Sequence, residues 1–289
     1  MTPQHATETF RLALVQMRVD GGCPQENLAR AEARIAETAR SGAQVVLLPE
    51  ALTLGWTHPS AASEAEPIPG GESFRRLSEC AKRHSLYVCA GVVERDGDKI
   101  FNAAVLIGPT GELLLHHRKI NELEIAHDCY ATGDRLQVVR TPLGTFGVMI
   151  CADAFAPGQA IARSLAMMGA DVILSPCAWA VPADHDNKRD PYGQLWRDNY
   201  MPVARDFHVW IAGASNVGWI TDGPWSGRKC IGCSLLVGPD GNEVIMAPYG
   251  VDADLSLYAD VKLTPRPARG DGWIRYWKEA QIAKPSTPS

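Results

Sequence analysis

The sequence predicts an α/β fold, and three observations carry that prediction. Short apolar runs rich in β-branched residues recur along the chain and are typical of strands. Ala-rich or amphipathic stretches separate many of these runs and are typical of helices. The two patterns alternate through both halves of the chain, and two mixed sheets with helices outside each would accommodate that order.

The clearest helix of the first half is predicted over residues 27–40, where Leu28, Ala31 and Ile35 form an apolar stripe. Residues 44–48 then form a short apolar run, which is typical of a strand covered on both faces. The other elements expected in this half are strands over 11–17, 86–93, 100–107 and 112–116 and a helix over 73–84.

The second half continues the alternation. A helix is predicted over 190–206, where Leu195, Val203 and Ala204 form a helix-like stripe. Residues 231–237 are predicted to form a single strand. The other elements expected here are strands over 137–141, 145–150, 172–174, 209–214, 243–246 and 254–260 and a helix over 159–168.

Composition excludes several classes of protein. The chain has 289 residues, 46% hydrophobic and 21% charged, as is ordinary for a soluble globular protein. The net charge is −5, and the sequence has no long runs of like charge. No surface that binds nucleic acid or a membrane is therefore expected. Residues 1–9 lack the features of a secretory signal, and most of the eight cysteines lie in apolar runs as free thiols would. A cytoplasmic location is therefore expected.

A glutamate, a lysine and a cysteine each end or follow an apolar strand pattern. They are Glu50, Lys119 and Cys151. Together these groups can hydrolyse a C–N bond through a thioester, because a cysteine at a strand tip is exposed enough to attack, a carboxylate can take its proton, and an ammonium can stabilise an oxyanion. Each residue also has a non-catalytic explanation. Glu50 could form a structural ion pair, Lys119 could belong to a solvated basic patch, and Cys151 could pack in the core.

The motifs around these residues resemble those of the nitrilase, or carbon–nitrogen hydrolase, superfamily. The resemblance implies a four-layer α-β-β-α sandwich, with an N-terminal segment at 1–9, one hydrolase domain at 10–263 and a C-terminal tail at 264–289. The matching motifs, in order, are Leu-Leu-Pro-Glu at 47–50, His-Arg-Lys at 117–119, Ile-Cys-Ala-Asp at 150–153, Gly-Ala-Asp-Val-Ile-Leu-Ser-Pro at 169–176, Gly-Cys-Ser at 232–234 and Gly-Pro-Asp-Gly at 238–241.

The resemblance also implies a role for each residue. Glu50 would be the general base, Cys151 the nucleophile, and Lys119 with the backbone N–H of Ala152 the oxyanion site. Neither a metal nor another cofactor is expected. The family has a second glutamate that positions the lysine, and here the sequence departs from the pattern. Glu122 and Glu124 both remain candidates, although the spacing from Asn121 to Glu124 is also that of a helix capping box.

The segment Cys151-Ala152-Asp153 looks closer to amidases and carbamoylases than to nitrile-hydrolysing members. The expected reaction is therefore hydrolysis of a small-molecule carboxamide to an acid and ammonia. The alternatives are hydrolysis of a nitrile, hydrolysis of an N-carbamoyl group and, from a different class, a non-catalytic binding scaffold. Trp179 and Trp56 lie near predicted strand ends and are candidates for the wall of the substrate pocket.

Two further groups of side chains could indicate a metal site or a redox motif. Cys230 and Cys233 have CxxC spacing, but they lack a second pair at zinc spacing and open a strand pattern instead of a helix, so they are expected to be strand residues. Asp184, His185 and Asp186 lie in a Pro- and Asp-rich loop, and no metal is expected there.

The end of the chain changes character. Residues 273–277 include Trp273, Tyr276 and Trp277, which are too apolar for a free tail. The family usually associates through faces of the sandwich. A homodimer or larger homo-oligomer is therefore expected, with the segment from Thr264 onward contacting the other subunit or packing on its own.

Overall fold

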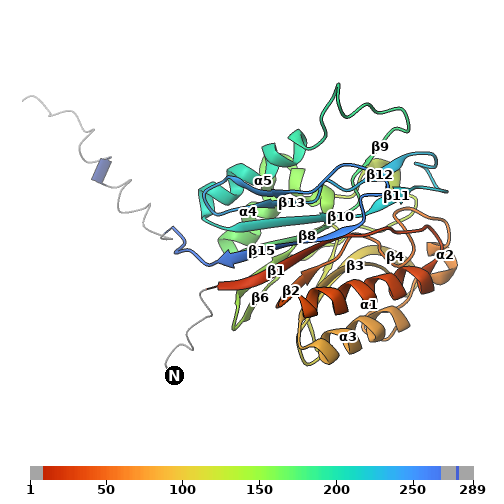
Figure 1. The fold of residues 1–289 in the computed structure, drawn as a ribbon, viewed down its shortest axis with the longest axis horizontal. Helices are drawn as coiled ribbons and strands as arrows, with labels where there is room; N and C mark the ends of the chain where they lie inside the picture. Colours follow the sequence, from red (N-terminus) through yellow and green to blue (C-terminus); the bar gives the residue numbers. More distant parts are fainter. Residues whose placement is uncertain (1–8, 268–277, 280–289) are drawn as a thin grey trace, which may run out of the picture.

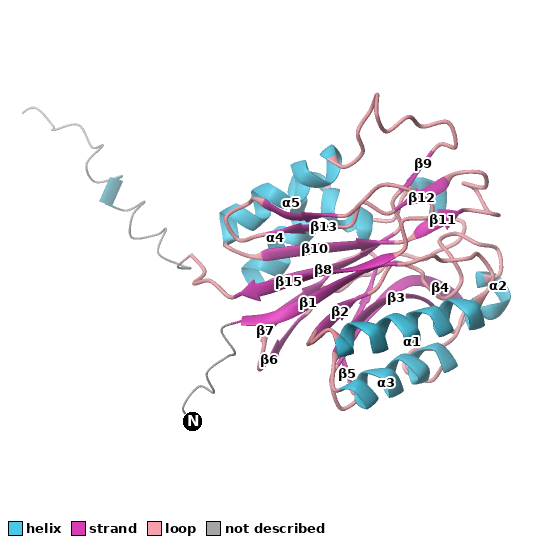
Figure 2. Cartoon of the chain, in the orientation of Figure 1, coloured by secondary structure: helices cyan, strands magenta, loops and turns pink. Residues whose placement is uncertain are grey.

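Two six-stranded β-sheets pack face to face in the computed structural model, which describes residues 9–267 and 278–279 (Figure 1). Helices cover the outer face of each sheet, so the predicted α/β class with helix-flanked sheets is confirmed (Figure 2). Residues 1–8 and the aromatic segment 273–277 lie outside the described residues. Within the described chain, no helix has the length and apolar content needed to cross a membrane.

The first sheet has the order β15-β1-β2-β3-β4-β5. Strand β2 is parallel to β1 and β3, whereas β3, β4 and β5 pair antiparallel in turn. The carboxyl ends of β2 and β5 therefore point to the same edge of the sheet. The bounds are β1 Thr9–Gln16, β2 Val45–Leu47, β3 Tyr87–Asp96, β4 Lys99–Ile107, β5 Leu113–Arg118 and β15 Leu255–Lys262.

The second sheet has the order β14-β13-β10-β8-β7-β6, and a small third sheet, β11-β12-β9, lies beside the carboxyl ends of its strands. In the second sheet β7, β8 and β10 are mutually parallel. The bounds are β6 Val138–Thr141, β7 Gly144–Val148, β8 Val172–Cys177, β9 Ala180–Val181, β10 Trp210–Ser215, β11 Val217–Trp219, β12 Lys229–Ile231, β13 Leu235–Val237 and β14 Glu243–Met246.

Helices α1 and α3 cover the first sheet, and α4 and α5 cover the second. Helix α1 begins at a proline, whose fixed φ and missing N–H suit a helix start. The bounds are α1 Pro24–Arg40, α2 Ala61–Glu64, α3 Glu72–His84, α4 Ala160–Met168 and α5 Gln194–Phe207, with 3₁₀ turns at Glu124–Ala126, Cys151–Phe155 and Pro157–Gln159.

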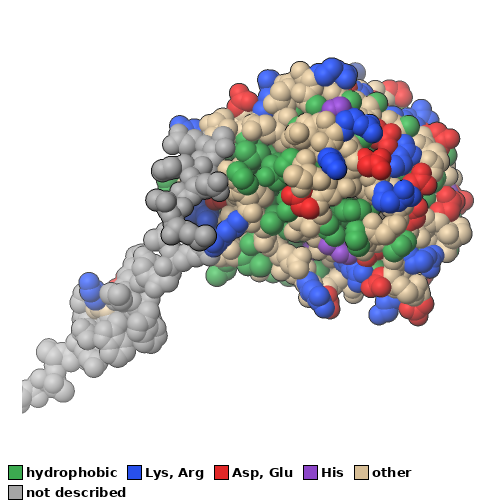
Figure 3. Space-filling model, turned by 90° about the horizontal axis from the view of Figure 1, so that it is seen from below, with side chains coloured by type: hydrophobic (Ala, Val, Ile, Leu, Met, Phe, Trp, Pro, Cys, Tyr) green, Lys and Arg blue, Asp and Glu red, His purple; other side chains and the backbone are tan. Residues whose placement is uncertain are grey.

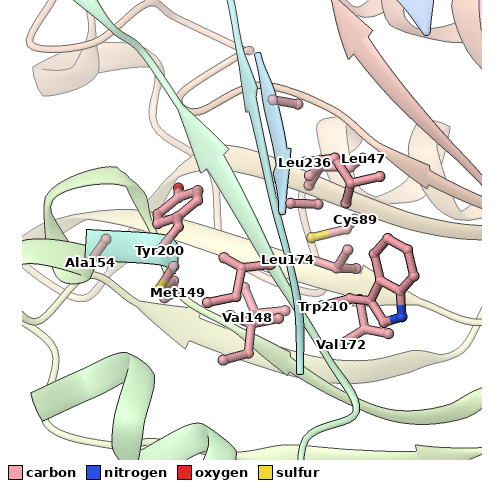
Figure 4. Packing of buried hydrophobic residues seen from close by; sticks show 14 of the residues in the cluster. Leu47, Cys89, Val148, Met149, Ala154, Val172, Leu174, Tyr200, Trp210 and Leu236 are labelled. Carbon is pink, nitrogen blue, oxygen red and sulfur yellow. The ribbon is translucent and has the colours of Figure 1, made fainter. Parts of the chain in front are cut away.

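The main core lies between the two sheets. Along β2, Val45 and Leu47 face the second sheet, while Val46 packs under α1 and α3, as expected for a strand covered on both faces. Figure 4 shows Leu47 and Cys89 of the first sheet meeting Leu174 of the second. Fully burying each such aliphatic side chain contributes about 1.5–3 kcal/mol, which holds the strand ends in place.

Two sequence predictions are corrected. The single strand expected over 231–237 is two strands in different sheets, because Gly232 and Cys233 adopt left-handed φ values of 68° and 59° and redirect the chain. Cys230 therefore lies in β12 and Cys233 in the turn. The helix expected from residue 190 begins at Gln194, and Leu195 in its first turn is 52% exposed instead of facing the interior.

Candidate active site

Glu50, Lys119 and Cys151 come together at one edge of the sandwich. Glu50 follows β2, Lys119 directly follows β5, and Cys151 follows β7 in the opposite sheet. The backbone N–H of Glu50 donates to the carbonyl of Cys177 at the end of β8, 3.2 Å away, and so ties the two sheets together here. The fold therefore joins residues that are far apart in the sequence.

Glu50 and Lys119 form a buried ion pair. Lys119 Nζ lies 2.8 Å from Glu50 Oε1, which also accepts a 2.6 Å hydrogen bond from Asn102 Nδ2. Both charged side chains are 1% exposed. Burial alone would lower the pKa of Lys119, but the charges of Glu50 and Glu122 outweigh it and raise that pKa well above its ordinary value. Lys119 is therefore a fixed positive charge.

Cys151 lies in a strained, buried turn. Its φ of 44° is left-handed, which is uncommon for a residue other than glycine and typical of functional sites. The residue is 8% exposed, so the expectation of an exposed strand-tip thiol is corrected. Burial, a hydrogen bond with Cys177 and the charge of Glu50 raise the pKa of Cys151, and Lys119 offsets them only in part. The thiol stays protonated at neutral pH and needs a base before it can attack.

Glu122 is the second glutamate that lies beside Lys119. Its Oε2 is 3.4 Å from Lys119 Nζ, an ion-pair distance longer than a typical N–H···O bond. Burial raises the pKa of Glu122 to about 7, although Lys119 opposes the shift. Glu124 is exposed in the turn Glu124–Ala126. The capping box suggested for Asn121 is not formed, because the N-cap of that turn is Leu123. Asn121 Nδ2 donates to the carbonyl of Ala152, 2.7 Å away.

His117 and Asp153 are a pair that the sequence did not single out for a role. His117 Nε2 lies 2.8 Å from Asp153 Oδ2, and both side chains are almost fully buried. Asp153 Oδ1 also accepts from the backbone N–H groups of Ile120 and Asn121. The sequence offered one indication of this pair, which is that each residue lies two positions from a proposed catalytic residue.

Trp56 and Trp179 are both buried near the site. The Trp56 ring centroid lies 6.0 Å from Lys119 Nζ, and Trp179 stacks on Trp196 with centroids 4.4 Å apart. The indole Nε1 atoms of Trp56 and Trp179 have no hydrogen-bond partner among the described residues. A substrate could satisfy such donors, so both remain candidates for the pocket wall.

The loop with Asp184, His185 and Asp186 lies on the surface, and both aspartates are exposed. Across residues 9–267 and 278–279, no group of three or more His, Cys, Asp or Glu side chains is arranged to hold a metal ion. The cysteines, in turn, are free thiols at all eight positions. Burial raises the pKa of Cys230 and of Cys233 to about 12 in each case, so neither has the character of a redox thiol.

Comparison with known proteins gives one consistent family. A model of the carbon–nitrogen hydrolase family matches residues 11–264. The chain is 33% identical over 258 residues to a nitrilase from Pyrococcus abyssi, covering 86% of this chain and 90% of that protein. It is 34% identical over 266 residues to human omega-amidase NIT2, covering 88% and 89%. The crystal structure of Nit3 from Saccharomyces cerevisiae, a nitrilase-superfamily member, superimposes with a TM-score of 0.74 at 23% identity, covering 96% and 97%.

Proposed function

This chain belongs to the carbon–nitrogen hydrolase family, and on that basis we propose that it hydrolyses a carboxamide to an acid and ammonia through a thioester on Cys151. The single observation that carries the proposal is the buried ion pair of Glu50 and Lys119 at the edge where Cys151 lies in its strained turn. A buried charged pair is costly to maintain, and catalysis gives a reason for its presence.

In the acylation half, Glu50 takes the proton of the Cys151 thiol, and the thiolate attacks the carbonyl carbon. The raised pKa of Cys151 is the reason that the base is needed. The oxyanion is stabilised by Lys119 and by the backbone N–H of Ala152. The C–N bond then breaks, and ammonia leaves with the proton that Glu50 holds.

In the deacylation half, Glu50 takes a proton from a water molecule, which attacks the thioester carbon. The same two donors stabilise the second oxyanion. The C–S bond breaks, the carboxylic acid leaves, and the proton on Glu50 returns to the sulfur. The net reaction is amide plus water to acid plus ammonia, and the residues named here need no metal or cofactor for it.

Glu122 is assigned the supporting role, in preference to Glu124. Its carboxyl is buried 3.4 Å from the lysine ammonium, whereas Glu124 is exposed. The negative charge of Glu122 would hold Nζ in place when Glu50 becomes protonated during each half-reaction.

The choice of substrate rests on Ala152-Asp153 after the nucleophile and on relatives called omega-amidases. The relative called a nitrilase keeps a nitrile as the alternative substrate, and an N-carbamoyl group is a further one. A non-catalytic scaffold would have no need for the buried pair. The free thiols support our assignment to a reducing compartment such as the cytoplasm.

The test is ammonia release from a panel of amides, nitriles and carbamoyl compounds, with Cys151→Ala beside the wild type. Turnover should fall by about 10³-fold or more, since loss of a nucleophile removes the covalent route. Mass spectrometry during turnover should find the acyl group on Cys151. Cys233→Ala is the matched control and should keep activity. An acyl group on Cys177 or Cys233 would overturn the assignment.

A further inference from the structure

The three proposed catalytic side chains belong to two different sheets. Glu50 and Lys119 both follow strands of the first sheet, and their 2.8 Å contact is made within it. Cys151 follows β7 of the second sheet. The alignment of the nucleophile with the lysine therefore depends on the bonds that join the two sheets at this edge.

The carboxylate of Asp153 makes four hydrogen bonds, three of which join the two sheets. Its Oδ1 accepts from the backbone N–H of Ile120 at 3.0 Å and of Asn121 at 2.7 Å. Its Oδ2 lies 2.8 Å from His117 Nε2 and accepts from the backbone N–H of Ile150 at 2.9 Å. Three of these partners flank Lys119, and the fourth directly precedes Cys151. One side chain thus holds the lysine segment and the nucleophile turn together.

The surroundings make this bond set strong. Asp153 is fully buried and His117 is 2% exposed, so water does not compete for the carboxylate. Burial opposes ionisation, but the hydrogen bonds of His117, Asn121 and Ile150 outweigh it and lower the pKa of Asp153. Asp153 is therefore an acceptor at neutral pH, and hydrogen bonds to a charged, buried acceptor are stronger than those between neutral groups.

The same contacts hold the peptide groups on both sides of the nucleophile. The N–H of Ile150 is bound by Asp153, and the carbonyl of Ala152 is bound by Asn121 Nδ2. Between them Cys151 keeps its left-handed φ of 44°. A non-glycine residue holds such a conformation only when its surroundings fix it, because the backbone alone disfavours it.

We propose that Asp153, with His117 as its donor, is a positioning residue that aligns the nucleophile of one sheet with Lys119 of the other. The inference rests on the proposed function and goes beyond it by assigning a role to residues outside the triad. Neither side chain takes part in the proton transfers. Their effect is on the distance and angle at which Cys151 and the Ala152 N–H meet the substrate held by Lys119.

The first test is Asp153→Asn, with Glu94→Gln as the matched control. Glu94 is likewise buried, at 2% exposed, and like Asp153 it pairs with a histidine of β5, here His116. It also accepts from Arg118. His116 and Arg118 alternate with His117 along the strand and so lie on its opposite face. Asp153→Asn should lower kcat by about 100-fold with KM nearly unchanged, since a misplacement of about 1 Å costs that much. Glu94→Gln should leave kcat unchanged, even if it lowers the Tm as much as Asp153→Asn does.

The second test keeps the proposal falsifiable if Asp153→Asn does not fold. His117→Gln preserves a side-chain N–H that can donate to Asp153, whereas His117→Leu removes the donor but keeps an apolar side chain. His117→Gln should restore most of the kcat that His117→Leu loses. An equal loss of kcat in His117→Gln and His117→Leu would contradict the proposal, and so would an equal loss in Asp153→Asn and Glu94→Gln. Asp153 and His117 would then contribute only to the packing of the core.

A third readout separates this proposal from the proposed function. Amide hydrogen exchange of Asp153→Asn should rise in peptides covering 118–123 and 147–155 and stay unchanged over 45–48 in β2. If no compound of the panel releases ammonia but exchange rises as stated, the proposed function fails and the structural role of Asp153 stands. If exchange is unchanged in both peptides, the positioning proposal fails whatever the substrate is.

Discussion

At the scale of single residues, the position of the Glu122 carboxyl indicates its role, which is to support Lys119. It lies three residues after Lys119, within ion-pair distance and out of water. Glu122→Gln keeps the shape and removes the charge, so kcat should fall by about 10-fold or more because Lys119 loses part of its support. Glu124→Gln is the control and should match the wild type in an ammonia-release assay. A larger loss of kcat in Glu124→Gln than in Glu122→Gln would assign the support of Lys119 to Glu124 instead.

The same residue makes stability depend on pH. The pKa of Glu122 is raised from its ordinary 4.5 to about 7, so folding favours the protonated form. Its contribution is fully present below pH 4.5 and is lost as the pH rises through about 7. A glutamine cannot ionise. The stability of Glu122→Gln relative to the wild type should therefore rise across this window, by up to about 3 kcal/mol at 1.36 kcal/mol per pKa unit.

Urea unfolding of both proteins at several pH values across this window would measure that difference. Glu124→Gln again serves as the control, because its side chain is exposed and its difference from the wild type should stay flat. A flat difference for Glu122→Gln as well would mean that folding does not shift the pKa of Glu122.

At the scale of elements, Gly91 of β3 is what lets the glutamate turn approach the sheet. A Cβ at this position would lie 2.5 Å from Glu50 Cα and 2.7 Å from the carbonyl oxygen of Pro49, and both are backbone atoms. Gly91→Ala must therefore displace Glu50. We expect a loss of about 1–3 kcal/mol in stability and a fall in kcat of about 10- to 100-fold.

Gly70→Ala is the matched control for that variant, because its nearest heavy atom would be an ordinary 3.6 Å away. It should change neither the urea midpoint nor kcat by much. Full activity in Gly91→Ala would show that the Glu50 turn can shift without consequence, which contradicts the fixed geometry proposed for it.

At the scale of the whole molecule, assembly remains a prediction. The face in Figure 3 intersperses acidic and basic side chains with hydrophobic areas, and no single sign of charge dominates it. Part of the tail already packs on its own subunit, since Arg266 pairs with Asp171 at 3.1 Å and Thr264 Oγ1 donates to the His208 carbonyl. A deletion from Thr264 would therefore remove contacts within the subunit.

A truncation after Pro267 is the sharper test because it keeps those contacts. The intact protein should be a dimer or larger in light scattering at micromolar concentration, and the truncated protein should dissociate more readily. The physical reason is the apolar surface of Trp273, Tyr276 and Trp277, which an interface would bury. A monomeric intact protein would contradict the prediction.

The class of fold and the order of most elements can be predicted from the sequence alone. Periodicity located strands such as β4 and helices such as α3 to within a few residues, because burial on one or both faces leaves a local pattern. The motifs around Glu50, Lys119 and Cys151 predicted the family, which the family match confirms. The catalytic roles of these residues stay a proposal.

Other features depend on how the elements pack together. The break at Gly232 and Cys233 was hidden because two short buried strands with an apolar turn between them look like one long strand. The burial of Cys151, the pairing of Lys119 with Glu50 and the bonds of Asp153 to the segment around Lys119 depend on contacts between residues far apart in the chain. Periodicity records which side of an element is buried, whereas the distances that set pKa values and catalytic alignment arise only when the two sheets meet.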